Sequence, residues 1–239
     1  MYTGVKELIS EFKESFDRIG KATKMAKTNI TNRGEKADKE TLKSEIDNIL
    51  AEWDSKRDNG IKLHEKEVAA EKKNNPKCIY EGYNSGKSDG MIDPSLNQLG
   101  NNNTYLEKLL FSNKHGIIGY ADKVVVKRGT IDITDTKVVS HIYRSSSFML
   151  DNGFKVPPKK MSHPLEHLDD CNYNEFVLQL SLYMYMAWDA NKNLKVGKLY
   201  INHIHTNDKG KIIDRKLIEV PYMRDEVKKM LKYKKLNES

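Results

Sequence analysis

The stretch GIIGYADKVVVKRGTIDITDTKVV, residues 116–139, decides the fold class. It holds two runs rich in Ile, Val and Thr on either side of KRGT at 127–130, and this pattern predicts a β-hairpin. Side chains along a strand alternate between two faces. Asp122 therefore shares a face with branched aliphatic residues in the first run, and Asp135 and Lys137 do so in the second. Charged groups on an apolar face need partners or a cation, because an unpaired buried charge is costly.

The length of the hairpin loop decides how close the two aspartates lie. If the loop has two or four residues, position 127 pairs with 130 and Asp122 lies directly opposite Asp135. Two neighbouring carboxylates repel unless a proton or a divalent cation lies between them. Such a pair beside the ammonium of Lys137 suits metal-assisted hydrolysis of a phosphodiester, with Mg²⁺ or Mn²⁺ on hard oxygen ligands. The alternative is a structural Asp–Lys–Asp cluster, or a register in which these residues face water.

The rest of the chain predicts an α/β fold with a central mixed sheet flanked by helices. Apolar residues at helical spacing predict helices over residues 1–19, 41–56, 61–73, 175–190 and from Tyr222 onward, with an interruption at Gly60. Strand signals begin at residue 116, and KVGKLYINHIHT and KIIDRKLIEV predict two more strands joined across residues 207–210. Polar or Pro- and Gly-rich stretches predict a loop or short helix over 20–40, a long loop or flap over 74–104 and a long connection over 143–170.

Composition narrows the function classes. The chain has 239 residues, with 41 Lys and Arg against 34 Asp and Glu, so its formal net charge is +7, which favours a polyanionic partner. No run approaches the roughly 18 apolar residues of a membrane span, and the N-terminal stretch lacks the apolar run of a secretory signal. We therefore expect a cytoplasmic protein with no membrane partner. Its two cysteines exclude a disulfide framework and a four-cysteine iron–sulfur cluster.

Several short motifs occur in the order typical of one nuclease superfamily. Gly119-Tyr120-Ala121-Asp122, followed by Asp135-Thr136-Lys137, resembles the G-x-x-D…(D/E)-x-K core of the PD-(D/E)XK nucleases. Gln179 and Tyr183 in QLSLY match the Q-x-x-x-Y helix motif of the branch that resembles RecB nuclease domains and lambda-type exonucleases. The layout is also similar to phage-encoded exonucleases and the mitochondrial genome maintenance exonuclease.

Two further positions fit the same branch. GIKLHEKE at residues 60–67 resembles its helix with a metal-binding histidine, here His64, with Glu67 one turn away. Glu107 lies where the branch often places a further acidic residue before the G-x-x-D strand. Without that context, His64 would be interpreted as a satisfied core histidine. For Glu107, a solvated helix charge remains an alternative of equal standing to a role in the site.

The resemblance implies a single nuclease domain over residues 1–239. Its core would be restriction-endonuclease-like and span residues 60–239, with a flap at 74–104 and a helical elaboration at 1–59. The metal ligands implied are His64, Asp122, Asp135, the backbone carbonyl of Thr136 and, as a further acidic ligand, Glu107. The catalytic set implied is Asp122, Asp135, Lys137, Gln179 and Tyr183, with Lys137 activating water and the last two positioning the strand.

The implied activity is that of a metal-dependent DNA exonuclease in phage or bacterial replication, recombination or repair. Its cofactor would be Mg²⁺ or Mn²⁺ without an iron–sulfur cluster, and its substrate single-stranded DNA or a free duplex end, in the host cytoplasm if the protein is phage-encoded. One alternative is a structure-specific endonuclease of the same fold. The other is a catalytically silent nucleic-acid-binding protein, because Val138 stands where the family commonly has Thr or Ser.

Some residues outside these motifs are weaker candidates. Ser145 and Ser146 follow the lysine strand and could contact a phosphate, or belong to a plain loop. His203 and His205 form an H-x-H pattern that suggests a metal, although the polar face of an edge hairpin explains it as well. The lysines between residues 228 and 235 fit either a solvated helix face or a DNA-binding surface.

Overall fold

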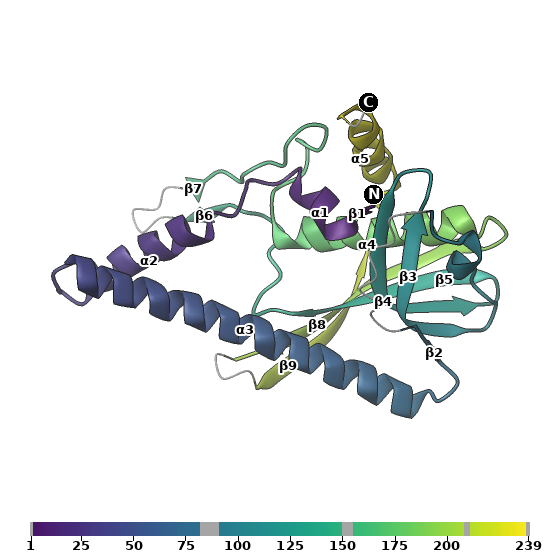
Figure 1. The fold of residues 1–239 in the computed structure, drawn as a ribbon, viewed down its shortest axis with the longest axis horizontal. Coiled ribbons are helices and arrows are strands. Elements are labelled where there is room, and N and C mark those ends of the chain that lie inside the picture. Colours follow the sequence, from purple (N-terminus) through teal and green to yellow (C-terminus); the bar gives the residue numbers. More distant parts are fainter. Residues whose placement is uncertain (1, 82–90, 150–154, 208–210, 238–239) are drawn as a thin grey trace.

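A central mixed sheet with helices on both faces forms the body of the protein (Figure 1). The computed structural model describes residues 2–81, 91–149, 155–207 and 211–237. The strand order is β2-β3-β4-β5-β8-β9, and β1 pairs with β4 off this path. The β5–β8, β2–β3 and β1–β4 pairs are parallel and the remaining pairs of this sheet are antiparallel. This confirms the predicted α/β class and matches the expected restriction-endonuclease-like core.

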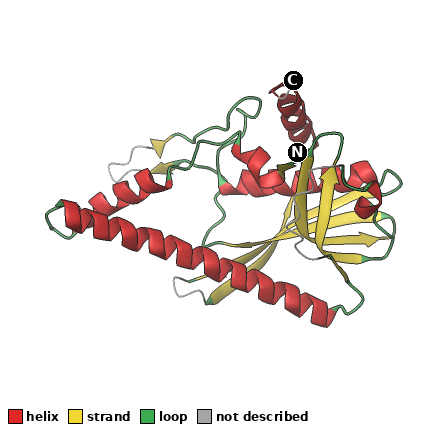
Figure 2. Ribbon diagram, in the orientation of Figure 1, coloured by secondary structure: helices red, strands yellow, loops and turns green. Residues whose placement is uncertain are grey.

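Figure 2 distinguishes the helices from the strands by colour. Their bounds are β1 Thr3–Gly4, α1 Val5–Ser10, α2 Arg18–Asn32, α3 Lys39–Asn74, β2 Ile79–Tyr80, η1 Pro94–Asn97, β3 Thr104–Ser112, β4 Ile117–Lys127, β5 Thr130–Val138, β6 Phe148–Met149, β7 Lys155–Val156, α4 Asn172–Ala190, β8 Lys195–Thr206, β9 Ile212–Val220 and α5 Arg224–Asn237.

The predicted hairpin is confirmed as β4 and β5. Lys127 pairs with Thr130 across a two-residue loop. The two loop residues have positive φ angles, 51° for Arg128 and 74° for Gly129. Two central residues with positive φ match the twist of the flanking strands, and this explains the tight turn. The paired positions run from Lys127↔Thr130 back to Lys123↔Thr134. Continued by one residue, this register places position 122 opposite 135, as expected.

Helix α4 provides the largest buried helical surface and covers one face of the sheet. The helix predicted over 175–190 is therefore confirmed, and it begins slightly earlier. Its apolar side chains pack with those of β4, β5 and β8, and α1 and α5 pack against its outer side. The strands predicted over 195–206 and 211–220 and the C-terminal helix are also confirmed, with residues 208–210 outside the described part.

Helix α3 differs from the prediction, because it runs unbroken for 36 residues through Gly60. One glycine inside a helix costs only about 1 kcal/mol relative to alanine, which the caps and packing of a long helix can offset. Asp38 caps the N-terminus by accepting from Thr41 N–H. The N-terminal half of α3 and helix α2 form an arm that extends away from the sheet (Figure 1), held together by Ala22, Ala26 and Ile49 with the residues around them.

The N-terminal segments also depart from the prediction. The helix expected over residues 1–19 is confined to α1, and most of the stretch expected as a loop or short helix over 20–40 belongs to α2. The long connection over 143–170 is confirmed, with the short β6–β7 pair inside it. Its residues 150–154 lie outside the described part.

Strand β3 was not predicted, since strands were expected only from residue 116. It pairs with β4 from Thr104↔Val125 to Ser112↔Ile117. The segment expected as a flap over 74–104 contains β2, which extends the sheet beside β3, and the short helix η1. Residues 82–90 of that segment lie outside the described part. The sheet therefore begins one hairpin earlier than the sequence pattern indicated, and Glu107 lies on a strand rather than a helix.

Candidate active site

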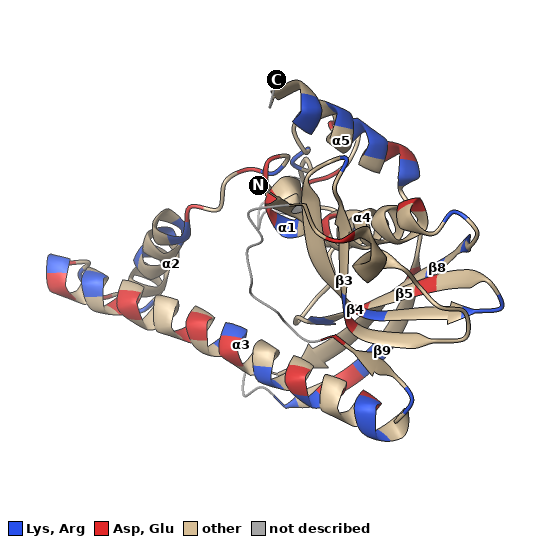
Figure 3. Cartoon of the chain, turned by 45° about the vertical axis from the view of Figure 1, so that its right-hand side comes forward, with Lys and Arg blue, Asp and Glu red and all other residues tan. Residues whose placement is uncertain are grey.

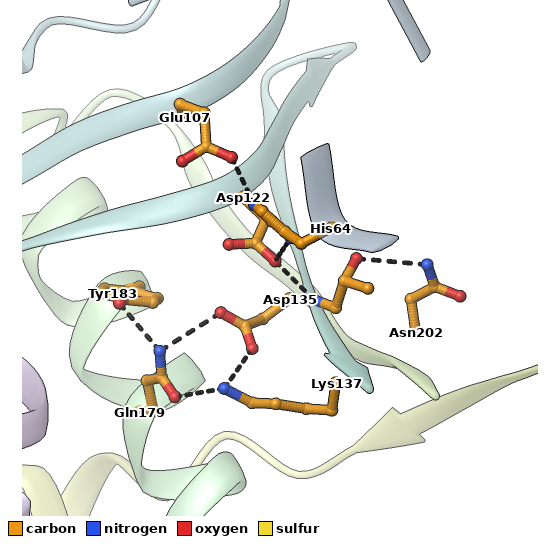
Figure 4. A network of polar contacts seen from close by, with 9 residues as sticks. His64, Glu107, Asp122, Asp135, Lys137, Gln179, Tyr183 and Asn202 are labelled. Atoms are coloured by element: carbon orange, nitrogen blue, oxygen red, sulfur yellow. Dashed lines mark hydrogen bonds and ion pairs between the residues drawn. The ribbon is translucent and has the colours of Figure 1, made fainter. Parts of the chain in front are cut away.

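The candidate site lies where strands β4 and β5 separate. Their backbone pairing ends at Lys123↔Thr134, and beyond it the carboxylate Oδ2 of Asp122 accepts the backbone N–H of Thr136 at 2.6 Å. The Asp122 side chain therefore accepts a backbone N–H of β5 at the point where the backbone of β4 no longer pairs with it. Figure 4 shows the polar contacts that converge on this opening from β3, β4, β5, α3 and α4.

The two faces of the sheet contribute different groups to the site. Thr134 and Thr136 line a pocket beneath α3, whereas Asp135 and Lys137 contact Gln179 of α4. This follows from the alternation of side chains along β5, which sends even and odd positions to opposite faces. The site therefore joins an α3 side and an α4 side through the opening between β4 and β5.

On the α3 side, an imidazole and two carboxylates converge. His64 Nε2 lies 2.8 Å from Glu107 Oε1, and His64 Nδ1 lies 3.6 Å from Asp122 Oδ2. One ligand atom from each of these residues falls within 4.8 Å of the other two. Glu107 is buried, while His64 and Asp122 are half-buried. The residues come from α3, β3 and β4, so the tertiary fold alone brings them together.

Glu107 reaches this cluster through an unusual backbone conformation. Its φ is 51° in the middle of β3, a left-handed value that residues with a Cβ adopt at a cost of about 1–2 kcal/mol. The flanking pairs Leu106↔Lys123 and Lys108↔Ala121 keep one register on either side of it. The strand therefore continues past Glu107 while this residue departs locally from extended geometry.

On the α4 side, Lys137 is held by two oxygens. Its Nζ lies 2.7 Å from Asp135 Oδ2 and 2.7 Å from Gln179 Oε1. Gln179 Nε2 donates to Asp135 Oδ1 at 3.3 Å and to Tyr183 Oη at 2.9 Å. The ammonium also lies 4.7 Å from the centre of the Phe176 ring. Gln179 thus holds the lysine through its oxygen, and the aspartate and tyrosine through its nitrogen.

The electrostatics of the α3 side favour bound protons in the absence of a cation. The hydrogen bond with Glu107 raises the pKa of His64 from 6.5 to about 9, against the opposing effect of burial, and the charges of Asp122 and Asp135 add to the rise. Burial and the neighbouring charge of Asp135 together raise the pKa of Asp122 from 3.8 to about 7. His64, the Thr136 N–H and Lys137 oppose that rise. Both pKa values are raised, which is typical of a site that concentrates negative charge.

A pocket of about 230 Å³ opens beside the cluster. It lies between α3 and the strands and is lined by His64, Glu67, Val68, Glu71, Asp122, Lys123, Thr134, Thr136, Asn202 and Leu217. Its acids outside the cluster are paired: Arg215 Nη2 lies 2.7 Å from Glu67 Oε1, and Lys123 Nζ lies 2.6 Å from Glu71 Oε1. The cluster of His64 and Asp122 is therefore open to a small ion from this side.

The residues present fit a divalent cation. Two carboxylates and one imidazole form a mixed oxygen and nitrogen donor set of the kind that binds divalent metals. Asp135 Oδ2 is buried and, apart from its ion pair with Lys137, no donor among the described residues approaches it in hydrogen-bonding geometry. The Asp135 Oδ2 atom can therefore accept a further ligand contact from a cation. Of the residues singled out from the sequence, the structure brings together His64, Glu107 and Asp122 as one group, and Asp135, Lys137, Gln179 and Tyr183 as the other.

The weaker candidates lie apart from this arrangement or have other partners. Ser145 Oγ donates to Ser147 Oγ, and Ser146 Oγ to the carbonyl of Lys159, all within the 143–170 connection. His203 Nε2 lies 2.8 Å from the carbonyl oxygen of Val139. The lysines of residues 228–235 lie on α5, which packs on α4 away from α3 (Figure 3).

Two contributors were not anticipated from the sequence. Phe176 lies beneath the Lys137 ammonium, and its position three residues before Gln179 on α4 is a signal that could have revealed it. Asn202 Nδ2 donates to Thr136 Oγ1 at 3.2 Å and lines the pocket. Its role comes from the pairing of β5 with β8, for which the sequence carries no local signal.

The chain matches no family model and no curated protein. Among solved structures, it is similar to a crystal structure of a protein from Eubacterium rectale named "Putative exonuclease", at 14% identity and a TM-score of 0.34. The match covers 74% of this chain and 60% of the other. Within the described ranges, the helices are too short or too polar to cross a membrane.

Proposed function

We propose that this protein is a metal-dependent DNA nuclease of the PD-(D/E)XK type that degrades DNA from an end. The observation that supports this most directly is the pairing of two groups across the β4–β5 opening. His64, Glu107 and Asp122 offer a cation site on one side, and Asp135 holds a lysine ammonium on the other. Metal-assisted phosphodiester hydrolysis needs both a cation near the phosphate and a group that handles a proton or developing charge.

His64, Glu107 and Asp122 would hold Mg²⁺ or Mn²⁺, joined by Asp135 and the backbone carbonyl of Thr136. In an extended strand, the N–H and C=O of one residue point to the same neighbouring strand. Since the Thr136 N–H points to Asp122, its carbonyl is aimed at the same opening. The imidazole favours Mn²⁺ over Mg²⁺, because Mg²⁺ prefers oxygen ligands. When bound, the cation would neutralise charge on the scissile phosphate and lower the pKa of a water molecule.

Lys137 would orient the attacking water and stabilise the charge that develops on the phosphate oxygens. Its ammonium is held by Asp135 and Gln179 at 2.7 Å each, so its position is set before substrate arrives. Gln179 would act through Lys137 and Asp135, and Tyr183 through Gln179. A side chain pre-positioned in this way spends little free energy on reorganisation during the reaction.

The substrate we propose is single-stranded DNA or a free duplex end. The whole chain, residues 1–239, would form one nuclease domain with its core at 60–239 and the N-terminal helices as an elaboration. The cellular role we propose is phage or bacterial DNA replication, recombination or repair, in the cytoplasm where that DNA is found.

Digestion of end-labelled DNA tests this proposal. Single- and double-stranded oligonucleotides are incubated with Mg²⁺, Mn²⁺ or EDTA, and the products are sized over time. With either cation, we expect short products that accumulate from one end of the DNA. We expect no products in EDTA, and we expect covalently closed circular DNA to stay intact. Cleavage of the closed circle would replace the exonuclease with an endonuclease.

The variant Lys137→Ala separates an active nuclease from a silent DNA-binding protein. We expect it to lower the rate by about 10²- to 10⁴-fold, the range for loss of a group that transfers protons, while DNA binding persists. Lys198→Ala, which removes an exposed lysine on β8 paired with Glu219, is the matched control and should cleave as the parent does. Equal and negligible cleavage by all three proteins would contradict the proposal.

A further inference from the structure

Four ring side chains form a continuous row beside the candidate site. In order they are His203, His205, His141 and Tyr143, here called the ring row. The centroids of His203 and His205 are 6.1 Å apart with the rings nearly parallel at 13°. His205 and His141 follow at 5.4 Å, and His141 and Tyr143 at 5.7 Å. Each ring therefore contacts the next, although they come from β8 and from the chain after β5.

The row begins next to the catalytic lysine we propose. His203 is the register partner of Lys137 across the parallel β5–β8 pair, so their backbones lie on adjacent strands, about 4.8 Å apart. Both point to the α4 face, because Asn202 and Thr136, the preceding pair, line the pocket on the α3 face. The other end of the row reaches the first turn of α4, where Asn172 lies.

The backbone beneath the row is fixed by hydrogen bonds. Asn172, the first residue of α4, donates from Nδ2 to the carbonyl of His141 at 2.9 Å and accepts the N–H of Tyr143 at 2.7 Å. The N–H of Tyr173 adds a bond to the carbonyl of Tyr143 at 3.3 Å. These contacts hold the exposed end of the row in place without a ligand, so little ordering is required on binding.

The exposed end of the row offers rings and a cation to solvent. Tyr143 is 58% exposed, and His141 is exposed as well. The next residue, Arg144, is exposed and its guanidinium lies 4.5 Å from the centre of the Tyr173 ring. Aromatic faces with an adjacent guanidinium are the groups on which unpaired bases stack and phosphates bind.

A metal site does not explain this row. His203 Nε2 already lies 2.8 Å from the Val139 carbonyl, and the near-parallel rings of His203 and His205 face one another rather than converging on one point. Asp214 pairs with His205 across the β8–β9 ladder, but its carboxylate lies 2.9 Å from Lys216 Nζ. The donors of the row are therefore not arranged around a common ion.

We infer that the exposed end of the ring row, His141 and Tyr143, is a stacking platform for the unpaired bases of single-stranded DNA leading to the cleavage site. This rests on the proposed function for its place in the reaction, while the binding itself needs no catalysis. Bases in a duplex are stacked on one another and hidden, so only an unpaired strand can use these rings. Because every base has an aromatic face, the platform would bind without sequence preference.

The test measures binding in EDTA, where the proposed metal-dependent cleavage cannot occur. Fluorescence anisotropy gives the affinity of the full chain for a labelled oligo-dT and for a blunt duplex of the same length. Replacement of Tyr143 by alanine, alone or with His141→Ala, should weaken single-strand binding about five- to hundredfold, the effect of losing one base–aromatic stack, and duplex binding less than twofold. Tyr143→Phe keeps the ring and should bind as the parent does.

A second readout reports the stacking directly. An oligonucleotide that carries 2-aminopurine loses fluorescence when this base stacks on a ring, and we expect that quenching to disappear in Tyr143→Ala. Tyr80 is an exposed tyrosine on β2 at the opposite edge of the sheet, and Tyr80→Ala is the matched control that should retain the quenching. Thermal unfolding confirms that each variant is folded.

The outcomes separate this inference from the proposed function. Unchanged single-strand affinity in Tyr143→Ala, or an equal loss for single strand and duplex, would overturn the platform, as would a parent protein that binds no single strand. If the parent binds single strands through Tyr143 but cleaves no DNA with Mg²⁺ or Mn²⁺, the platform stands and the nuclease proposal fails.

Discussion

The buried Lys108 forms an ion pair with the exposed Glu81, with Glu81 Oε1 2.5 Å from Lys108 Nζ, immediately beside the candidate metal ligand Glu107. Glu81 also accepts the N–H of Leu109 at Oε2, and its own N–H donates to the carbonyl of Leu106. Glu81 therefore contacts β3 on both sides of Glu107, the residue with a φ of 51°. This relationship explains how β3 holds Glu107 in a costly conformation that faces His64.

Replacing Glu81 by alanine should weaken metal binding although Glu81 is not a ligand. Loss of its two side-chain contacts, with Lys108 Nζ and the Leu109 N–H, would let β3 relax toward extended geometry and turn Glu107 away from His64, although the backbone bond to Leu106 remains. Residues that orient metal ligands typically contribute 10- to 100-fold in affinity, so we expect about a tenfold higher Kd for Mn²⁺ by titration calorimetry. Glu219→Ala, which removes an exposed carboxylate on β9, serves as the control. An unchanged Kd in Glu81→Ala would show that β3 holds Glu107 without it.

Gln179→Ala should slow cleavage more than it weakens metal binding. The amide contacts Lys137, Asp135 and Tyr183, and the alanine leaves the ammonium held by Asp135 alone. We expect a fall in kcat of about tenfold or more, since misplaced catalytic groups lose the benefit of fixed orientation. Single-turnover rates and Mn²⁺ affinity, measured on the same sample, check this. A larger loss in affinity than in rate would assign Gln179 to the metal side of the site.

Gly119→Ala should destabilise the fold and disturb the site. A Cβ at this position would lie 2.7 Å from Tyr183 Cε1 and 3.1 Å from Val5 Cγ2, closer than packed carbon atoms approach. Overpacking of this kind costs about 1–3 kcal/mol, and relief would displace the tyrosine that contacts Gln179. The matched control is Gly60→Ala in α3, where the nearest atom, Val138 Cβ, lies at 3.9 Å. It should stabilise the protein by up to about 1 kcal/mol through helix propensity. Thermal unfolding checks that Gly119→Ala lowers the unfolding temperature and that Gly60→Ala raises it.

The contribution of His64 and Asp122 to the stability of the metal-free protein should fall as pH rises from about 4 to 9. The pKa of His64 is raised from 6.5 to about 9, so its contribution to stability is complete below pH 6.5 and is lost as pH rises through 9. The pKa of Asp122 is raised from 3.8 to about 7, so the folded state also binds more protons than the unfolded state between these values.

Mn²⁺ should reverse this trend, because a cation replaces protons at the same groups and binds more tightly as they ionise. Unfolding temperatures measured from pH 5 to 9, in EDTA and in Mn²⁺, should diverge toward high pH. His64→Gln should flatten the EDTA curve between pH 6.5 and 9. A parallel pair of curves would mean that the cation does not compete with these protons.

The sequence was informative where structure depends on neighbours along the chain. The β4–β5 hairpin follows from two β-rich runs and a turn at Arg128-Gly129, so its register places Asp122 opposite Asp135 before any other contact is known. The spacing of Gln179 and Tyr183 on one helix likewise predicted that they share a face, and their side chains are in contact. The chemistry assigned to them stays a prediction.

The sequence misled where burial and pairing outweigh local preference. TYLEKLLFS has apolar residues at helix-like spacing and two adjacent charges, yet it forms β3 because β4 and β2 supply its hydrogen bonds and Glu81 neutralises Lys108. Gly60 predicted a break, but α3 passes through it because one glycine costs less than a long, capped and packed helix contributes.

By itself, the sequence determined the hairpin, the helix α4 and the acidic and basic residues that these elements carry, since local periodicity and turn geometry act over a few residues. Only the tertiary structure decided that His64 of α3 meets Glu107 of β3, 43 positions away, and that His203 lies beside Lys137. Such meetings depend on how helices and strands pack against one another. The free energy of that packing comes from buried surface shared by distant segments, which no short stretch of the chain encodes.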